Sequence, residues 1–195
     1  MTQAFDDISS EELARDAQRG NHKALDALIR RHKSEAYRVA LRMCGRPFDA
    51  EEILQISLER VFRHLRGYDP ERKFRPWLLR IVSNQARTFL RIQKLKSLFF
   101  LGNPEHTPEP VYHSNPGKEL RQAHVRSSVE QALLVLPLEQ REAFIFKHIE
   151  GMSFDEMAEV TGVSPGTLRV RTHRARKAVL QYLRDRNVTV SALDE

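Results

Sequence analysis

The side chains in this chain that are best suited to binding chemistry are the cations gathered near its C-terminal end. Residues 164–186 carry seven lysines and arginines against one acidic residue, Asp185. The seven are Arg169, Arg171, Arg174, Arg176, Lys177, Arg184 and Arg186. Both side-chain types pair with phosphate, and arginine also donates two parallel hydrogen bonds to guanine. The cluster and the net charge of +6 favour a polyanionic partner, although charge alone does not separate nucleic acid from membrane.

Two capping signals predict that this cluster lies on the second helix of a helix-turn-helix. Ser153 and Glu156 have the S-x-x-E spacing of a capping box, which starts a first helix. Gly162 is placed to end that helix in a left-handed conformation. Ser164 can cap a second helix at once, and Pro165 suits its first turn because no hydrogen bond is lost there. Two helices joined by so short a turn must cross steeply, as they do in a helix-turn-helix.

The periodicity of the second helix separates a packing face from a charged face. At about 100° per residue, one side collects Leu168, Thr172, Ala175, Val179 and Tyr182. A major groove accepts one helix, and side chains near the helix start read the bases, so we assign base reading to Arg169, His173 and Arg174. Contacts with phosphates are assigned mainly to Arg171, Arg176 and Lys177. The alternative is a solvated charged face that binds no ligand.

A second basic stripe is predicted on a helix that starts at Pro76. Its apolar face carries Trp77, Leu78, Ile81, Val82, Phe89 and Ile92. Its other face carries Arg80, Ser83, Asn84, Arg87, Arg91 and Lys94. The preceding loop adds Tyr68, Lys73, Phe74 and Arg75. Cations interleaved with aromatic rings are typical of sites for single-stranded or distorted DNA, where exposed bases stack on the rings.

Nearly every periodic segment of the chain has helical spacing, which predicts an all-α fold. A stretch with four prolines, residues 97–119, interrupts this pattern and is interpreted as a flexible linker. The chain therefore divides into two small helical domains, residues 1–96 and 120–186, followed by a tail at residues 187–195. The apolar start of the linker, residues 98–101, either docks on a neighbouring helix or binds a partner.

The composition excludes several classes of protein. Cys44 is the single cysteine, so neither an internal disulfide nor a cysteine-based zinc site is expected. The acidic N-terminus lacks the apolar run of a signal peptide, and no segment approaches the roughly 18 apolar residues of a membrane span. The sequence has no glycine-rich phosphate loop and no nucleophile elbow. We expect a soluble, cytoplasmic protein that is not an enzyme, holds no metal or cofactor, and does not insert into a membrane.

The two basic helices and their surroundings resemble those of extracytoplasmic-function (ECF) sigma factors of the sigma-70 family. Residues 24–91 resemble region 2 of that family and residues 136–179 resemble region 4, in the family's order. The resemblance implies core RNA polymerase and promoter DNA as partners. The helix that starts at Ser164 would read the −35 element. The loop at residues 68–75 and the helix bearing Asn84 would melt and read the −10 element.

The resemblance also implies a polymerase-docking helix in region 2. Its docking residues would be Asp49, Glu52, Gln55 and Glu59. Asp49 and Glu52 have the spacing of a capping-box variant as well, with Phe48 and Ile53 as a hydrophobic staple. Ile56 departs from the family, which often has an acidic residue there. Many relatives are held inactive by an anti-sigma factor, so such a partner is expected for this chain.

A different two-domain transcriptional regulator is the main alternative. It accounts equally well for the helix-turn-helix, but not for a second basic helix preceded by an acidic docking helix. Co-purification with core RNA polymerase would separate the two interpretations. The promoter sequence, the inducing signal and the identity of an anti-sigma partner do not follow from the residues.

Overall fold

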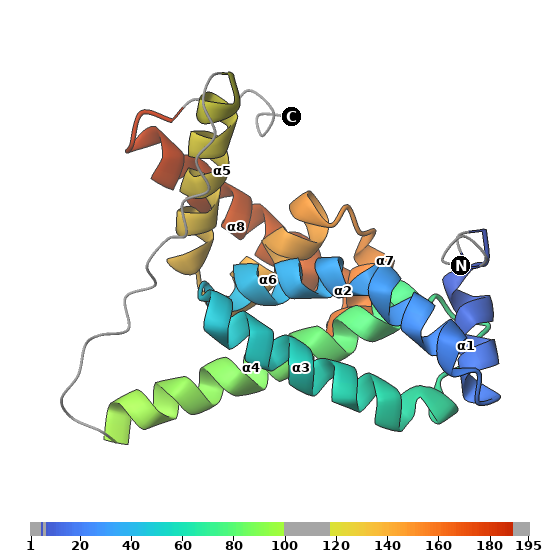
Figure 1. Cartoon of the computed structure of the whole chain (residues 1–195). Helices are drawn as coiled ribbons and strands as arrows, with labels where there is room; N and C mark the ends of the chain where they lie inside the picture. Colours follow the sequence, from blue (N-terminus) through green and yellow to red (C-terminus); the bar gives the residue numbers. More distant parts are fainter. Residues whose placement is uncertain (1–4, 6, 100–117, 189–195) are drawn as a thin grey trace.

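The computed structural model describes residue 5, residues 7–99 and residues 118–188. Of the helices in these parts, α1 (Ser10–Gln18), α2 (His22–Cys44), α3 (Pro47–His64) and α4 (Phe74–Phe99) form a first bundle. The second bundle contains α5 (Lys118–Leu134), α6 (Leu138–Phe144), α7 (Phe154–Thr161) and α8 (Pro165–Arg184). A 3-10 turn at Leu65–Gly67 follows α3, and a π-helical turn at Ile145–Ile149 follows α6. The prediction of two small all-α domains is confirmed (Figure 1).

Local capping chemistry sets several helix ends where the sequence predicts them. The Asn21 side chain accepts hydrogen bonds from two backbone N–H groups of the first turn of α2, and Gly45 ends that helix with a φ of 80°. Ser153 and Glu156 form the predicted capping box of α7, and Gly162 ends α7 with a φ of 71°. Glycine adopts these left-handed conformations without the steric cost of a Cβ.

The predicted capping box at the start of α3 is wrong. The helix already begins at Pro47, and its N-cap residue makes no side-chain cap. Asp49 therefore lies inside the first turn, where it is buried, and Phe48 is 75% exposed, so it makes no hydrophobic staple. Proline is suited to the first helical position, and here it overrides the weaker capping signal two residues later.

Two further helix starts differ from the expectation. α4 begins at Phe74 rather than at Pro76, because a proline within the first turn gives up no intrahelical hydrogen bond. α1 was not predicted, although Ser9 and Glu12 form a capping box at its start. The S-x-x-E spacing of these two residues is the signal that would have revealed it.

The two bundles pack against each other, which no pattern in the sequence indicates. α7 lies along α4, while α5 and α6 contact α2 (Figure 1). Arg141 of α6 donates hydrogen bonds to the backbone carbonyls of Met43, at the end of α2, and of Leu134, at the end of α5. The Leu134 side chain closes over Gly45, where an added Cβ would lie 2.6 Å from it. Both contacts join the end of α2 to the second bundle.

Most of the predicted linker, residues 100–117, and the end of the predicted tail, residues 189–195, lie outside the described parts of the chain. Residues 97–99 continue α4, whose C-terminal end extends beyond the first bundle and exposes Leu98 and Phe99 (Figure 1). The flexibility of the linker and the limits of the domains stay predictions. No helix among the described residues is long and apolar enough to cross a membrane.

Candidate nucleic-acid interface

The start and the packing face of α8 agree with the prediction. The Ser164 hydroxyl accepts a hydrogen bond from the backbone N–H of Thr167 at 3.4 Å, and Pro165 occupies the first helical position. The buried residues of the helix include Leu168, Thr172, Ala175 and Val179, and Tyr182 is half-buried. These contacts hold one side of α8 against α6 and α7 and leave the opposite side in solvent.

The opposite side of α8 carries the predicted cations. Its exposed side chains include Arg169, His173, Arg174 and Lys177, while Arg171 and Arg176 are half-buried at its edges. A shallow groove of about 370 Å³ on this side is lined by His173, Lys177 and Arg184 among others. The side chains assigned to DNA thus lie on one accessible helix face, as insertion into a major groove requires.

One cation of this face lies over an aromatic ring of the neighbouring helix. The guanidinium carbon of Arg169 is 5.2 Å from the ring centroid of Phe154, the first residue of α7. The Lys147 ammonium is 4.9 Å from the same centroid. Cations within about 6 Å of a ring face are attracted by its quadrupole. No local sequence pattern predicts the role of Phe154, because a contact between two helices leaves none.

The two aromatic side chains that were predicted to face DNA in the first bundle are instead buried. Phe74 is 0% and Tyr68 4% exposed, and both rings contact Trp77, with centroid distances of 5.5 and 4.9 Å. The Tyr68 hydroxyl donates a hydrogen bond to the backbone carbonyl of Arg72, and burial raises the pKa of Tyr68 to about 12. A ring stacks on a base only where its face is accessible. In this conformation Tyr68 and Phe74 support the loop and are not stacking surfaces.

The predicted polar residues of the −10 stripe fall into two groups. Exposed on α4 are Arg80, Asn84 and Arg91. The others, Lys73, Arg75 and Arg87, form ion pairs with carboxylates of the second bundle. The Lys73 ammonium, for example, is 3.0 Å from Oε1 of Glu156 in α7. Three of these six residues are therefore paired with another part of the same chain, although the Lys73 side chain stays 73% exposed.

Arg75 lies between carboxylates from both bundles. Its Nε donates a hydrogen bond to Oε1 of Glu35 at 2.5 Å, and its Nη2 donates one to the backbone carbonyl of Glu150 at 3.0 Å. Glu150 pairs with two arginines: its Oε2 lies 3.3 Å from Arg75 Nη2, and its Oε1 lies 3.3 Å from Arg42 Nη1. Burial and the neighbouring Glu35 raise the pKa of Glu150. For Glu35, burial is outweighed by hydrogen bonds from His32 and Arg75, which lower its pKa to about 2.

Glu142 of α6 is a buried carboxylate directed at α4. Only 2% of the residue is exposed. The Ser83 hydroxyl donates a hydrogen bond to its Oε1, and Arg87 Nε lies 3.2 Å from the same oxygen. Burial raises the pKa of Glu142, while the charge of Arg87 and the hydrogen bond from Ser83 oppose that shift. A buried carboxylate is costly unless it is paired, so Glu142 is held to Ser83 and Arg87 while the bundles are in contact.

Three of the four predicted docking residues on α3 are exposed, and the fourth is not. The exposed residues are Glu52, Gln55 and Glu59. Asp49 is 5% exposed and accepts a hydrogen bond from the Gln93 side chain of α4 at 3.1 Å. Asp49 thus joins α3 to α4 and does not reach the surface in this conformation.

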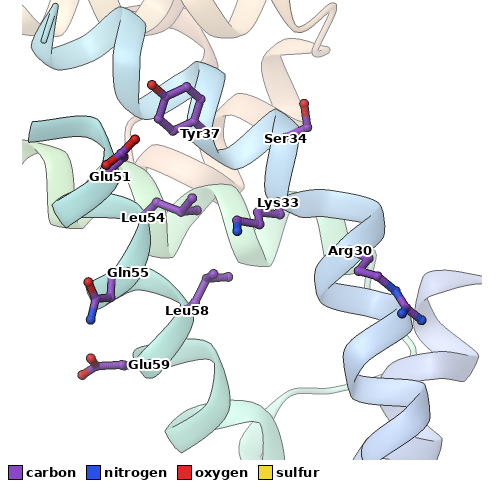
Figure 2. A pocket seen from close by; sticks show the side chains of 9 residues that line it. All are labelled: Arg30, Lys33, Ser34, Tyr37, Glu51, Leu54, Gln55, Leu58 and Glu59. Carbon is purple, nitrogen blue, oxygen red and sulfur yellow. The ribbon is translucent and has the colours of Figure 1, made fainter. Parts of the chain in front are cut away.

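A groove of about 880 Å³ runs between α2 and α3 (Figure 2). Leu54 and Leu58 of α3 point toward α2 and supply apolar surface. The rim on α3 carries Glu59, and the rim on α2 carries Arg30 and Lys33. Apolar surface between oppositely charged rims suits an amphipathic helix, which is a recurring mode of protein recognition.

The described residues contain no metal-binding cluster, and their single cysteine is buried. Within residues 7–99 and 118–188, no three histidine, cysteine or acidic side chains gather as a metal site would need. Burial raises the pKa of the Cys44 thiol to about 11, so it is a poor nucleophile at neutral pH. A helix-turn-helix with an exposed cationic face, beside a second cationic bundle, defines the class as a DNA-binding protein with two helical domains.

Comparison with known proteins gives the family. The Sigma-70 region 2 family matches residues 28–95, and the family described as Sigma-70, region 4 matches residues 126–179. The ECF RNA polymerase sigma factor SigE of Mycolicibacterium smegmatis is 33% identical over 164 residues, which are 81% of this chain and 61% of SigE. The RNA polymerase sigma factor CarQ of Myxococcus xanthus is 30% identical over 172 residues, which are 88% of this chain and 96% of CarQ. The structure of CnrH in complex with the cytosolic domain of CnrY matches with a TM-score of 0.65 and 28% identity, covering 90% of this chain and 97% of CnrH.

The chain belongs to the sigma-70 family of RNA polymerase sigma factors, and within it to the ECF sigma factors. The first bundle contains region 2 and the second bundle contains region 4. In this family the two regions mediate recognition of the −10 and −35 promoter elements. Sigma factors are transcription initiation factors and not enzymes, since the polymerase carries out the chemistry.

Proposed function

We propose that α8 reads the −35 element, that the loop at residues 68–75 and α4 act on the −10 element, and that α3 docks on core RNA polymerase. The observation that carries this proposal is the exposed cationic face of α8, which begins at a capped helix start and lies opposite a well-packed face. Base-reading side chains need this accessibility near a helix N-terminus.

For the −35 element, we assign the base contacts to Arg169, His173 and Arg174, which are exposed within the first half of α8. Arginine recognises guanine through two parallel hydrogen bonds, so Arg169 and Arg174 are the main candidates for specificity. Contacts with the phosphates fall to Ser164, Arg171, Arg176 and Lys177. These contacts orient the helix and carry no sequence information of their own.

For the −10 element, Arg80, Asn84 and Arg91 are the residues that are accessible on α4. Lys73, Arg75 and Arg87 join them once the second bundle has moved away from α4. Tyr68 and Phe74 act indirectly, by supporting the loop from within the core. DNA melting needs a surface that holds single-stranded phosphates and bases, and cations beside a rigid loop provide one.

For polymerase docking, we assign the surface formed by Glu52, Gln55 and Glu59 together with the groove between α2 and α3 (Figure 2). Asp49 contributes by holding α3 to α4. The relative CnrH is found in complex with CnrY, and we propose that an anti-sigma factor controls this chain in a similar way. The factor acts in the cytoplasm, where polymerase and promoter DNA meet. Its proposed domains span residues 1–96 and 120–186, followed by a tail at 187–195. The proposed linker at 97–119 includes the last residues of α4 and the first residues of α5.

A titration against promoter duplex, with and without core polymerase, tests the proposal. Start sites mapped after overexpression would first supply the promoter. The chain alone should bind weakly and with a strong dependence on salt, because it makes mainly phosphate contacts. With core polymerase, binding should become tight, sensitive to the spacing of the two elements, and accompanied by melting. Sequence-specific nanomolar binding by the chain alone would contradict this division of labour.

A further inference from the structure

The contact between the two bundles brings acidic side chains of region 4 onto cations of region 2. Glu142, Glu150 and Glu156 of the second bundle are each paired with a cation of the proposed −10 surface, and Glu150 is also paired with Arg42. We name these three glutamates the acidic seam. Their partners are Arg87, Arg75 and Lys73, in that order. The same three cations are assigned above to the −10 element, so the inference rests on the proposed function.

The pairing at Arg75 occupies the guanidinium from two sides. Its Nη2 donates a hydrogen bond to the backbone carbonyl of Glu150 at 3.0 Å and lies 3.3 Å from the Glu150 carboxylate. Its Nε donates a hydrogen bond to the Glu35 carboxylate at 2.5 Å. A DNA phosphate would have to displace these acceptors, since Arg binds phosphate through the same N–H groups. Arg75 is therefore engaged while the bundles are closed.

The pairing at Arg87 is buried and harder to exchange with solvent. Glu142 is 2% exposed, accepts a hydrogen bond from the Ser83 hydroxyl and forms an ion pair with Arg87, whose Nε lies 3.2 Å away. Ser83 and Arg87 both belong to the stripe of α4 that was predicted to face DNA. When the bundles separate, Glu142 returns to water and the two α4 side chains become available together.

The ion pair between Lys73 and Glu156 is exposed. It compensates the charge of Lys73 but contributes little to the stability of the fold. The Lys73 side chain is 73% exposed, and ion pairs of this kind contribute little to folding. The pair nevertheless brings a third carboxylate to the loop that precedes α4, next to the other two pairs. The three pairs thus run along one contact, from the loop to the middle of α4.

We propose that the acidic seam is an autoinhibitory contact in which three carboxylates of region 4 take the places of DNA phosphates on region 2. In the closed chain, the −10 element would have to displace these carboxylates before it could bind Lys73, Arg75 and Arg87. Polar contacts between domains are typical of reversible interfaces, and the cations stay compensated when phosphate replaces carboxylate. Separation of the bundles, by polymerase or otherwise, is what exposes the −10 surface.

The test compares two full-length triple variants without polymerase. The seam variant carries Glu142→Gln, Glu150→Gln and Glu156→Gln, and glutamine at 156 still fits the capping box of α7. The control carries Glu139→Gln, Asp155→Asn and Glu159→Gln, which are exposed acidic residues of α6 and α7 and change the net charge equally. The measurements are the radius of gyration by small-angle X-ray scattering and the affinity for a fluorescent single-stranded DNA of mixed sequence.

The seam variant should have a larger radius of gyration and bind the single strand about tenfold more tightly than the control. Its plot of log affinity against log salt should be steeper by about two, because each contact with a single-stranded phosphate contributes about 0.7. Equal affinity of the two variants, or tighter binding without expansion, would overturn the proposal. If the seam variant unfolds, a double variant with Glu150→Gln and Glu156→Gln replaces it, because it leaves the buried Glu142 unchanged. The same expansion and tighter binding are expected of the double variant, and their absence would overturn the proposal.

The assignment of the −10 surface is checked separately. Arg75→Ala in the otherwise unchanged chain, bound to core polymerase, should impair melting of promoter DNA. Unchanged melting would contradict the proposed function and leave the closure of the bundles standing. If Arg75→Ala impairs melting but the seam variant neither expands nor binds more tightly, the proposed function is retained and the autoinhibitory contact is rejected.

Discussion

The guanidinium carbon of Arg169 lies 5.2 Å from the centroid of the Phe154 ring, so the first residue of α7 holds a side chain of the recognition helix. The Lys147 ammonium lies over the same ring and donates a hydrogen bond to the backbone carbonyl of Met152 at 3.1 Å. A side chain that is already held in place loses less conformational entropy on binding. We therefore expect Phe154 to act as a positioning residue for the contact proposed between Arg169 and DNA.

Replacing this ring should weaken recognition of the −35 element. Phe154→Leu keeps an apolar side chain against the bundle and removes the ring, so we expect a loss of about 0.5–1 kcal/mol in binding by the holoenzyme. Phe154→Tyr should retain the affinity. In a double-mutant cycle, Phe154→Leu should have no further effect in an Arg169→Ala background. Additive losses would show that the ring acts only through packing.

Arg174 should contribute specificity as well as affinity. It is exposed on the face of α8 that is assigned to the bases, so Arg174→Ala should weaken promoter recognition by about 1–3 kcal/mol and relax the preference at one upstream base pair. Arg184→Ala, at the other end of the same helix, is the matched control and should leave the base preference intact. An equal loss on every upstream sequence would assign Arg174 to a phosphate.

Asn84 should affect the downstream element alone. Its side chain is exposed on α4 in the same stripe as Arg80 and Arg87. Asn84→Ala should therefore alter the −10 preference in a promoter library read by the holoenzyme and leave −35 recognition unchanged. An unaltered −10 preference would remove Asn84 from the site.

Ionisation of Glu156 should make the free energy of unfolding depend on pH in the acid range. Hydrogen bonds from Ser153 and the pairing with Lys73 lower the pKa of Glu156 from its ordinary 4.5 to about 2. A lowered pKa means that the ionised carboxylate stabilises the folded state above about pH 4.5 and that this contribution is lost as the pH falls toward 2. The free energy of unfolding of Glu156→Gln should accordingly lie below that of the unchanged chain at pH 7. The gap should close between pH 4.5 and 2, and a constant gap would contradict the assignment.

The features that could be predicted depend on interactions within one or two helical turns. The caps at Asn21, Ser153 and Ser164 join residues two or three positions apart, and Gly162 ends α7 through its own backbone conformation. The faces of α8 follow from a period of 3.6 residues in the same way. Where two local signals competed, as at the start of α3, proline prevailed over the capping box.

The sequence by itself determined the all-α fold, the helix-turn-helix and the sign of charge on the two basic helices, α4 and α8, because each is encoded by neighbouring residues. Only the tertiary structure decided which of those residues are accessible. Tyr68, Phe74 and Asp49 are buried by contacts with other helices, and Arg75 is bound by Glu150, which lies 75 residues away. Such pairings depend on how whole helices pack, and packing is set by the summed apolar contacts of the bundles rather than by any single charged residue.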